Sequence, residues 1–124
     1  MFTQTQTTSN MTITTWWQQM QTRLKLSLHL LQDDAPPLWK LENPEGFLLH
    51  LKRSYELTSK VECPVGAGRM RAHLLNAIHY LMESLSKPDR ASFESQVRLD
   101  VARAEYSMLV GELMEHGIYE AIPA

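Results

Sequence analysis

The sequence predicts an all-α protein: an antiparallel four-helix bundle with a long C-terminal helix and a disordered N-terminal leader. Two observations favour this fold. Apolar residues recur three or four positions apart in four segments of the 124-residue chain, which is the spacing of one helix face. Most of the 5 glycines and 6 prolines fall between those segments, where they separate helices. We expect residues 1–12 to be a flexible leader and residues 13–124 to be one helical-bundle domain.

Three of the segments, residues 15–32, 45–60 and 69–86, are expected to be amphipathic helices, because each has one apolar arc and one polar face. The second helix has a clear start, since Asn43 is a good N-cap and Pro44 then occupies the first helical position. The apolar arcs of the three helices contain Trp16, Trp17, Met20, Leu24, Leu28 and Leu31, then Phe47, Leu48, Leu51, Tyr55 and Leu57, and then Met70, Leu74, Ile78, Leu81 and Leu85.

The fourth segment, residues 89–116, is apolar on two sides. We expect Pro88 to open this helix and Gly117 to end it. One apolar line, the Phe93 stripe, consists of Phe93, Val97, Val101, Ala104 and Met108. A second line, the Leu109 stripe, lies nearly opposite and consists of Leu99, Ala102, Tyr106, Leu109, Val110 and Leu113. A helix that is apolar on two sides must bury two sides.

The two stripes suggest a protein partner. The fourth helix would be about 40 Å long, so three shorter helices would cover one stripe and only part of the other. We expect the remainder to contact a second protein chain or the C-terminal tail "IYEAIPA", residues 118–124. We favour a second copy of the chain, which makes the protein a homodimer. The residues expected at that interface are Leu99, Tyr106, Leu109 and Leu113.

Composition narrows the classes of function. The chain is 44% hydrophobic and 21% charged with a net charge of −2, so it has no overall field that would hold a polyanion or an anionic membrane. The N-terminus lacks a signal-peptide pattern, and no stretch approaches the ~20 apolar residues of a membrane span. With a single cysteine, no internal disulfide is expected, which fits the cytoplasm. We expect a small non-catalytic interaction or regulatory protein, of the accessory kind found in bacterial or mobile-element systems.

The stretch "VECPVGAGRMRAH", residues 61–73, could be a ligand-binding loop or a corner between two helices. A glycine-rich turn before a helix can hold a phosphate, but this one is shorter than a P-loop and no Lys-Ser or Lys-Thr follows it. Cys63 is not accompanied by a Cys–His signature of a nucleophile. We interpret the stretch as a corner, and we expect no catalytic residue.

A first alternative function is nucleic-acid binding. Residues 52–71 carry a net charge of +3, and clustered cations bind the phosphate backbone. The residues that would do so are Lys52, Arg53, Arg69 and Arg71.

A second alternative is a ligand or metal site inside the bundle around His50, which lies within an apolar arc, with Cys63 near the end of the bundle. The paired Glu-x-x-His and His-Glu-x-x-His motifs of metal sites do not occur in the sequence. His73 lies on a polar face, where we expect it to be solvated, and we expect Glu105 and Glu112 to be solvated or at an interface. We therefore expect no metal and no cofactor.

Overall fold

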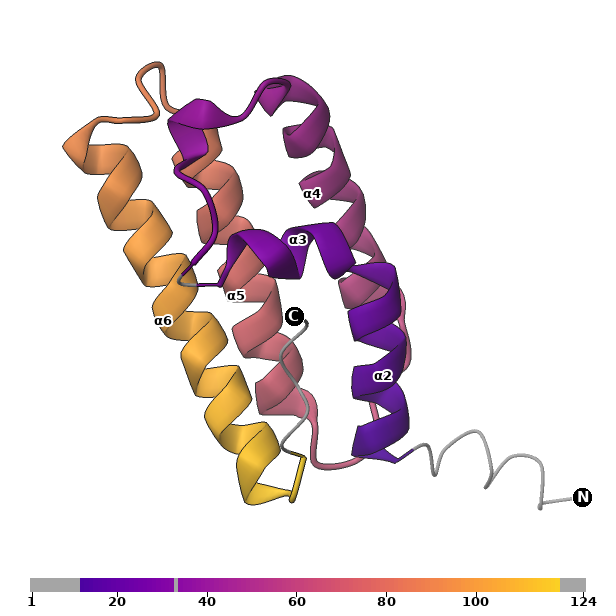
Figure 1. The fold of residues 1–124 in the computed structure, drawn as a ribbon. Helices are drawn as coiled ribbons and strands as arrows, with labels where there is room; N and C mark the ends of the chain where they lie inside the picture. Colours follow the sequence, from indigo (N-terminus) through magenta and orange to yellow (C-terminus); the bar gives the residue numbers. More distant parts are fainter. Residues whose placement is uncertain (1–11, 33, 119–124) are drawn as a thin grey trace, which may run out of the picture.

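The structure is a computed structural model that describes residues 12–32 and 34–118 (Figure 1). These residues form α2 (Ile13–Arg23), α3 (Lys25–Leu30), the 3₁₀ helix η1 (Leu38–Lys40), α4 (Pro44–Lys60), α5 (Gly68–Leu85) and α6 (Phe93–Glu115). The prediction of an all-α fold is confirmed, because the described residues contain helices and no strand. The predicted leader lies outside the described residues except for Thr12, whose Oγ1 caps α2 by accepting a hydrogen bond from the Thr15 N–H at 3.0 Å.

The first expected helix is two helices, so the prediction of one continuous helix over residues 15–32 is wrong. Leu24 has φ −111° and ψ 20°, which interrupts the helix, and α3 turns away from α2 across the face of the molecule (Figure 1). Leu30 shows what the bend achieves. It lies outside the apolar arc of a straight helix, yet only 1% of its surface is exposed, because the bend turns it into the core.

α4 and α5 begin within one residue of the predicted positions. Oδ1 of Asn43 accepts a hydrogen bond from the Gly46 N–H at 3.0 Å, and Pro44 is the first helical residue, as predicted. Residues 61–67 form the corner between α4 and α5. Gly66 has φ 90° there, a left-handed conformation that favours glycine.

α6 begins at Phe93 rather than at residue 89. The reason is that Ser92 is the N-cap of α6: its side chain accepts a hydrogen bond from the Ser95 N–H at 3.2 Å. Pro88 therefore lies in the preceding loop and does not open the helix. The end of the helix is as predicted, because Gly117 follows it with φ 79° and closes a glycine C-cap.

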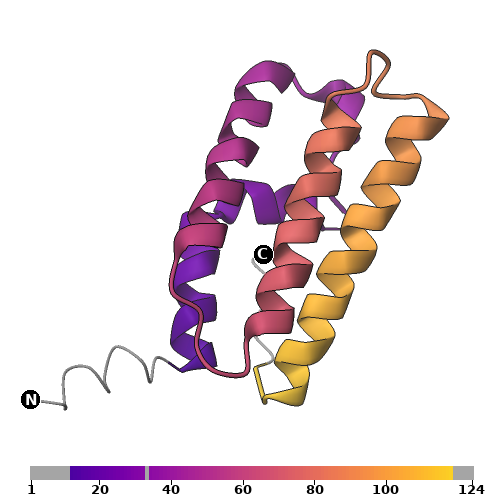
Figure 2. The same ribbon diagram turned by 180° about the vertical axis from the view of Figure 1, so that it is seen from behind.

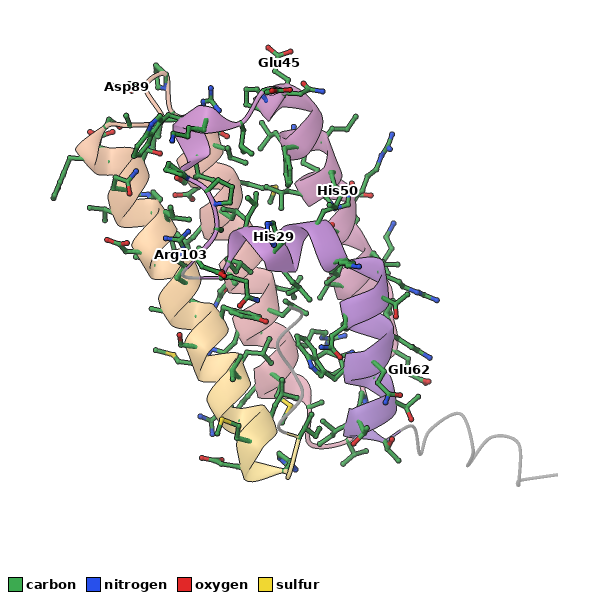
Figure 3. All side chains as sticks on the ribbon, in the orientation of Figure 1. His29, Glu45, His50, Glu62, Asp89 and Arg103 are labelled. Atoms are coloured by element: carbon green, nitrogen blue, oxygen red, sulfur yellow. The ribbon has the colours of Figure 1, made fainter. Side chains whose placement is uncertain are left out.

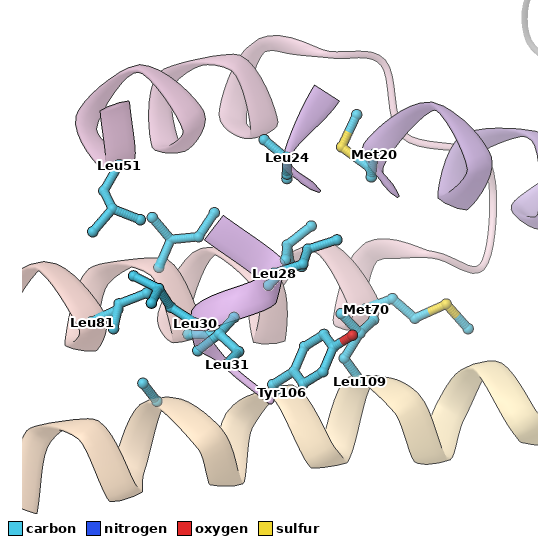
Figure 4. Close-up of a cluster of buried hydrophobic side chains, with 14 of the residues drawn as sticks. Met20, Leu24, Leu28, Leu30, Leu31, Leu51, Met70, Leu81, Tyr106 and Leu109 are labelled. Atoms are coloured by element: carbon cyan, nitrogen blue, oxygen red, sulfur yellow. The ribbon is translucent and has the colours of Figure 1, made fainter. Parts of the chain in front are cut away.

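α4, α5 and α6 lie side by side, each antiparallel to the one before it, with α5 in the middle (Figures 1 and 2). α2 and α3 cover the inner side of this layer, and the core lies between them. No helix within the described ranges has a stretch long and apolar enough to cross a bilayer. The core residues labelled in Figure 4 come from α2 to α6 and from the two residues that flank α3. They are Met20, Leu24, Leu28, Leu30, Leu31, Leu51, Met70, Leu81, Tyr106 and Leu109.

The Leu109 stripe belongs to this core, so the prediction that it contacts a partner is wrong. Within one copy of the chain, the exposed fractions of Leu99, Tyr106, Leu109 and Leu113 are 3%, 4%, 0% and 0%. The cause is the path of the chain before α4: Leu31 and Gln32, which follow α3, lie beside Tyr106, while α5 covers the adjacent side of α6. The three shorter helices expected from the sequence thus bury more of this stripe than predicted.

Truncating the buried stripe tests this arrangement. Leu109→Ala is expected to lower the free energy of unfolding by about 2–5 kcal/mol, because it removes buried methyl groups and leaves a cavity. Leu26→Ala is the control, since Leu26 is 56% exposed on α3 and surface changes of this kind usually shift stability by less than ~0.5 kcal/mol. Urea unfolding measures the free energy of unfolding of both variants. Similar small decreases in the two variants would contradict the burial of Leu109.

Candidate functional site

The Phe93 stripe forms the outer face of α6, because the Leu109 stripe occupies the core. α6 lies at the edge of the molecule, with no other described element beyond it (Figures 1 and 2). Phe93 is 82% exposed and Met108 is 52% exposed, Ala104 is exposed, and Val97 and Val101 are half-buried.

Exposed apolar side chains gather on α6 more than elsewhere in the described residues. Large ones occur singly on α3, on η1, on α4 and in the corner before α5, whereas α6 carries three: Phe93, Met108 and Met114. A single exposed apolar residue needs no explanation, but a contiguous exposed patch marks an interaction site in soluble proteins. The outer face of α6 is therefore the candidate interaction surface.

A groove adjoins this surface between the end of α3 and the C-terminal half of α6. It has a volume of about 240 Å³. Its polar wall includes the hydroxyl of Tyr106, which accepts a hydrogen bond from Nε2 of Gln32 at 3.4 Å. Burial raises the pKa of this hydroxyl and outweighs the opposing effect of that hydrogen bond. The residues that line the groove are Leu31, Gln32, Tyr106, Ser107, Val110, Gly111 and Met114.

A polar cluster joins α5 to α6 on the side of α6 away from this groove. Nδ1 of His73 lies 3.0 Å from Oε1 of Glu105, and Nε2 lies 3.1 Å from Oε2 of Glu112, within ion-pair distance but without hydrogen-bond geometry. Asn76 donates to the same oxygen of Glu105 at 3.0 Å. The side chains of His73, Glu105 and Glu112 are 19%, 18% and 20% exposed. The expectation that His73 is solvated is therefore wrong, and the two glutamates are half-buried where α6 meets α5.

The cluster holds two helices together and shifts one ionisation. Burial by itself raises the pKa of the Glu105 carboxyl, but the hydrogen bonds from His73 and Asn76 and the charge of His73 together outweigh it. The pKa of Glu105 therefore lies below its ordinary value of 4.5.

Among the described residues, no three His, Cys, Asp or Glu side chains are placed to hold a metal ion.

The four cations of the nucleic-acid alternative lie on two helices and have different neighbours. Lys52 and Arg53 lie in the middle of α4, and Lys52 faces a groove that also contains His79 of α5. Arg69 lies in the first turn of α5, about 15 Å along the helix from His79, and its Nε is 3.7 Å from Oε1 of Glu112. Arg71 donates to the Val61 carbonyl at 3.5 Å in the corner.

The two residues of the ligand alternative also lie apart in the fold. His50 is half-buried on α4, with its ring edge-on to Phe47 at 6.1 Å, and its Nε2 has no hydrogen-bond partner among the described residues (Figure 3). Cys63 is half-buried in the corner between α4 and α5. Burial raises the pKa of the Cys63 thiol more than the charge of Arg71 lowers it, so the thiolate is disfavoured.

Comparison with known proteins finds no matching family model, no matching curated protein and no matching solved structure.

The lowered pKa of Glu105 predicts a loss of stability in acid. Between the native pKa and 4.5, the unfolded chain binds more protons than the folded chain, so stability rises with pH. The contribution is complete above 4.5 and is lost as the pH falls through the native value. Glu105→Gln removes this titration and is expected to flatten the slope of unfolding free energy against pH between the native pKa and 4.5.

Urea unfolding at a series of acidic pH values measures these slopes. Glu115→Gln is the matched control, because Glu115 is an exposed glutamate on the same helix. Equal slopes for the wild type and Glu105→Gln would show that the cluster does not stabilise the ionised form of Glu105.

Proposed function

We propose that this protein is a non-catalytic interaction protein that self-associates through the Phe93 stripe. The observation that supports the proposal is the exposure of this stripe along the outer face of α6, where Phe93 is 82% and Met108 is 52% exposed. A residue such as Phe93 gains free energy when a second surface removes it from water. Soluble monomers rarely expose contiguous apolar patches without such a use.

The proposal keeps the homodimer expected from the sequence but moves its interface. The Leu109 stripe serves the core of each chain, and the Phe93 stripe serves the contact between chains. A helix that is apolar on two opposite sides then has both sides buried. A two-fold symmetric dimer is the simplest assembly that covers the same stripe on both copies, because each copy presents the surface that the other needs.

Polar residues border the stripe on both sides, as in the rim of a protein interface. On the side of the groove these residues are Gln96, Asp100, Arg103 and Ser107. On the side of α5 they are Arg98, Glu105 and Glu112, which contact Glu83, His73 and Arg69 of α5. The contacts to α5 hold α6 in place, so a partner would meet a rigid apolar strip at low entropic cost.

Sedimentation velocity over a range of protein concentrations tests the proposal. The wild type is expected to form a dimer as the concentration rises, and Met108→Glu is expected to remain a monomer, because it places a charge within the stripe. Leu49→Glu is the matched control: Leu49 is 50% exposed on α4, close to the 52% of Met108, but lies outside the stripe. A wild type that stays monomeric at every concentration, or equal effects of the two substitutions, would contradict the proposal.

A further inference from the structure

We infer that two copies of α6 pair antiparallel, with Phe93 of each copy seated beside Gly111 of the other. This inference rests on the proposed self-association through the Phe93 stripe, and it gives that contact a geometry. Two features of α6 carry it. A large, 82% exposed side chain lies at its first position, and an exposed glycine with space around it lies near its other end.

The fold of a single chain does not require glycine at position 111. Glycine in the interior of a helix is less favourable than alanine. The positive φ angles of the described glycines are at Gly66 and Gly117, so Gly111 has an ordinary helical backbone. A Cβ atom added at Gly111 would meet nothing within 4 Å. The space that this glycine leaves opens to the outside of the chain, where a second molecule can approach the helix closely.

The spacing along α6 matches the two features to each other. Phe93 and Gly111 are five helical turns apart at 3.6 residues per turn, so they face the same direction at a separation of about 27 Å. A two-fold axis midway between them places each phenylalanine opposite the glycine of the other copy. The same pairing sets Val101 opposite Ala104 of the other copy. A parallel pairing would instead place two phenylalanines together at one end and leave a void at the other.

The groove beside Gly111 has room for the ring. Its volume is about 240 Å³, and an apolar cavity of ~150 Å³ is known to hold a benzene molecule. Apolar atoms of Leu31, Val110 and Met114 line it. Met114 is 47% exposed, so a ring seated beside Gly111 would also cover part of that side chain.

Opposite charges meet along one edge of this antiparallel pairing. In the antiparallel arrangement, Asp100 of one copy lies nearly level with Arg103 of the other, and the two-fold axis repeats the pair. Asp100 is exposed. Arg103 forms no ion pair with another described residue, and its Nε has no hydrogen-bond partner there (Figure 3).

Cross-linking of two single-cysteine variants tests the orientation. Cys63→Ser first removes the native thiol, and Gln96→Cys and Ser107→Cys are then made separately on the edge of the stripe. In the antiparallel dimer these two positions lie nearly level, so a short bismaleimide is expected to link the mixed variants and to link neither variant alone. A mixture of Ser107→Cys with Ser59→Cys, which is exposed on α4, is the control and should not be linked.

Filling the space at Gly111 tests whether the Phe93 ring of the other copy packs there. Gly111→Leu and Phe93→Ala are each expected to raise the Kd of self-association at least about tenfold, as loss of an aromatic anchor at an interface does. The urea midpoint of Gly111→Leu at low concentration should not fall, because a Cβ has no neighbour there. An unchanged Kd in Gly111→Leu would contradict the seat.

The outcomes separate the two proposals. A dimer in which each single-cysteine variant links to itself contradicts the antiparallel pairing but leaves self-association intact. A wild type that is monomeric in sedimentation at every concentration contradicts both.

Discussion

The antiparallel contact of α5 with α6 is the interaction on which the rest of the structure depends. Near the connecting loop, Ser84 and Ser95 are fully buried and exchange hydrogen bonds with each other's carbonyl groups at 2.7 and 3.0 Å, which holds the helices close. At the far end, Arg69 faces Glu112. Between these ends, each step toward the N-terminus of α5 is matched by a step toward the C-terminus of α6. This pairing fixes the rotation of α6 about its own axis and therefore determines which of its two apolar stripes faces the core.

The path of α2 and α3 also determines which apolar stripe of α6 is buried. The break at Leu24 directs α3 across the layer of long helices, and Oγ of Ser27 lies 3.1 Å from Oγ of Ser54 where α3 meets α4. Small side chains at this crossing allow the two helices to approach closely. α3 leads the chain to α6, where Leu31 and Gln32 lie beside Tyr106, so a side of α6 that three straight helices would leave open is closed within one chain. The Phe93 stripe is left outside.

Several elements could be predicted from the sequence because their signals are local. Asn43 and Pro44 start α4, and Gly117 ends α6, whatever the rest of the chain does. The choice between the two stripes of α6 could not be predicted, because both are apolar and only tertiary contacts distinguish them. The break at Leu24 could not be predicted either, because no proline or glycine lies near it in the sequence. The polar cluster of His73 depends on the pairing of two helices, and only the spacing of Glu105 and Glu112 by seven residues, two helical turns, pointed to a shared partner.

The two stripes differ in a way that suits the core for one and the proposed contact between chains for the other. The core stripe is built from leucines and a tyrosine, large side chains that fill the interior to the density a folded core requires. The outer stripe has valine and alanine at its centre, and larger side chains only toward its ends. Exposing small apolar residues to water costs less free energy than exposing large ones. A monomer can therefore expose the valines and alanine at the centre of the Phe93 stripe at a modest cost. Two helices can also approach closely where side chains are small, and the ends then contribute the larger contacts. A surface of this composition fits association that is reversible.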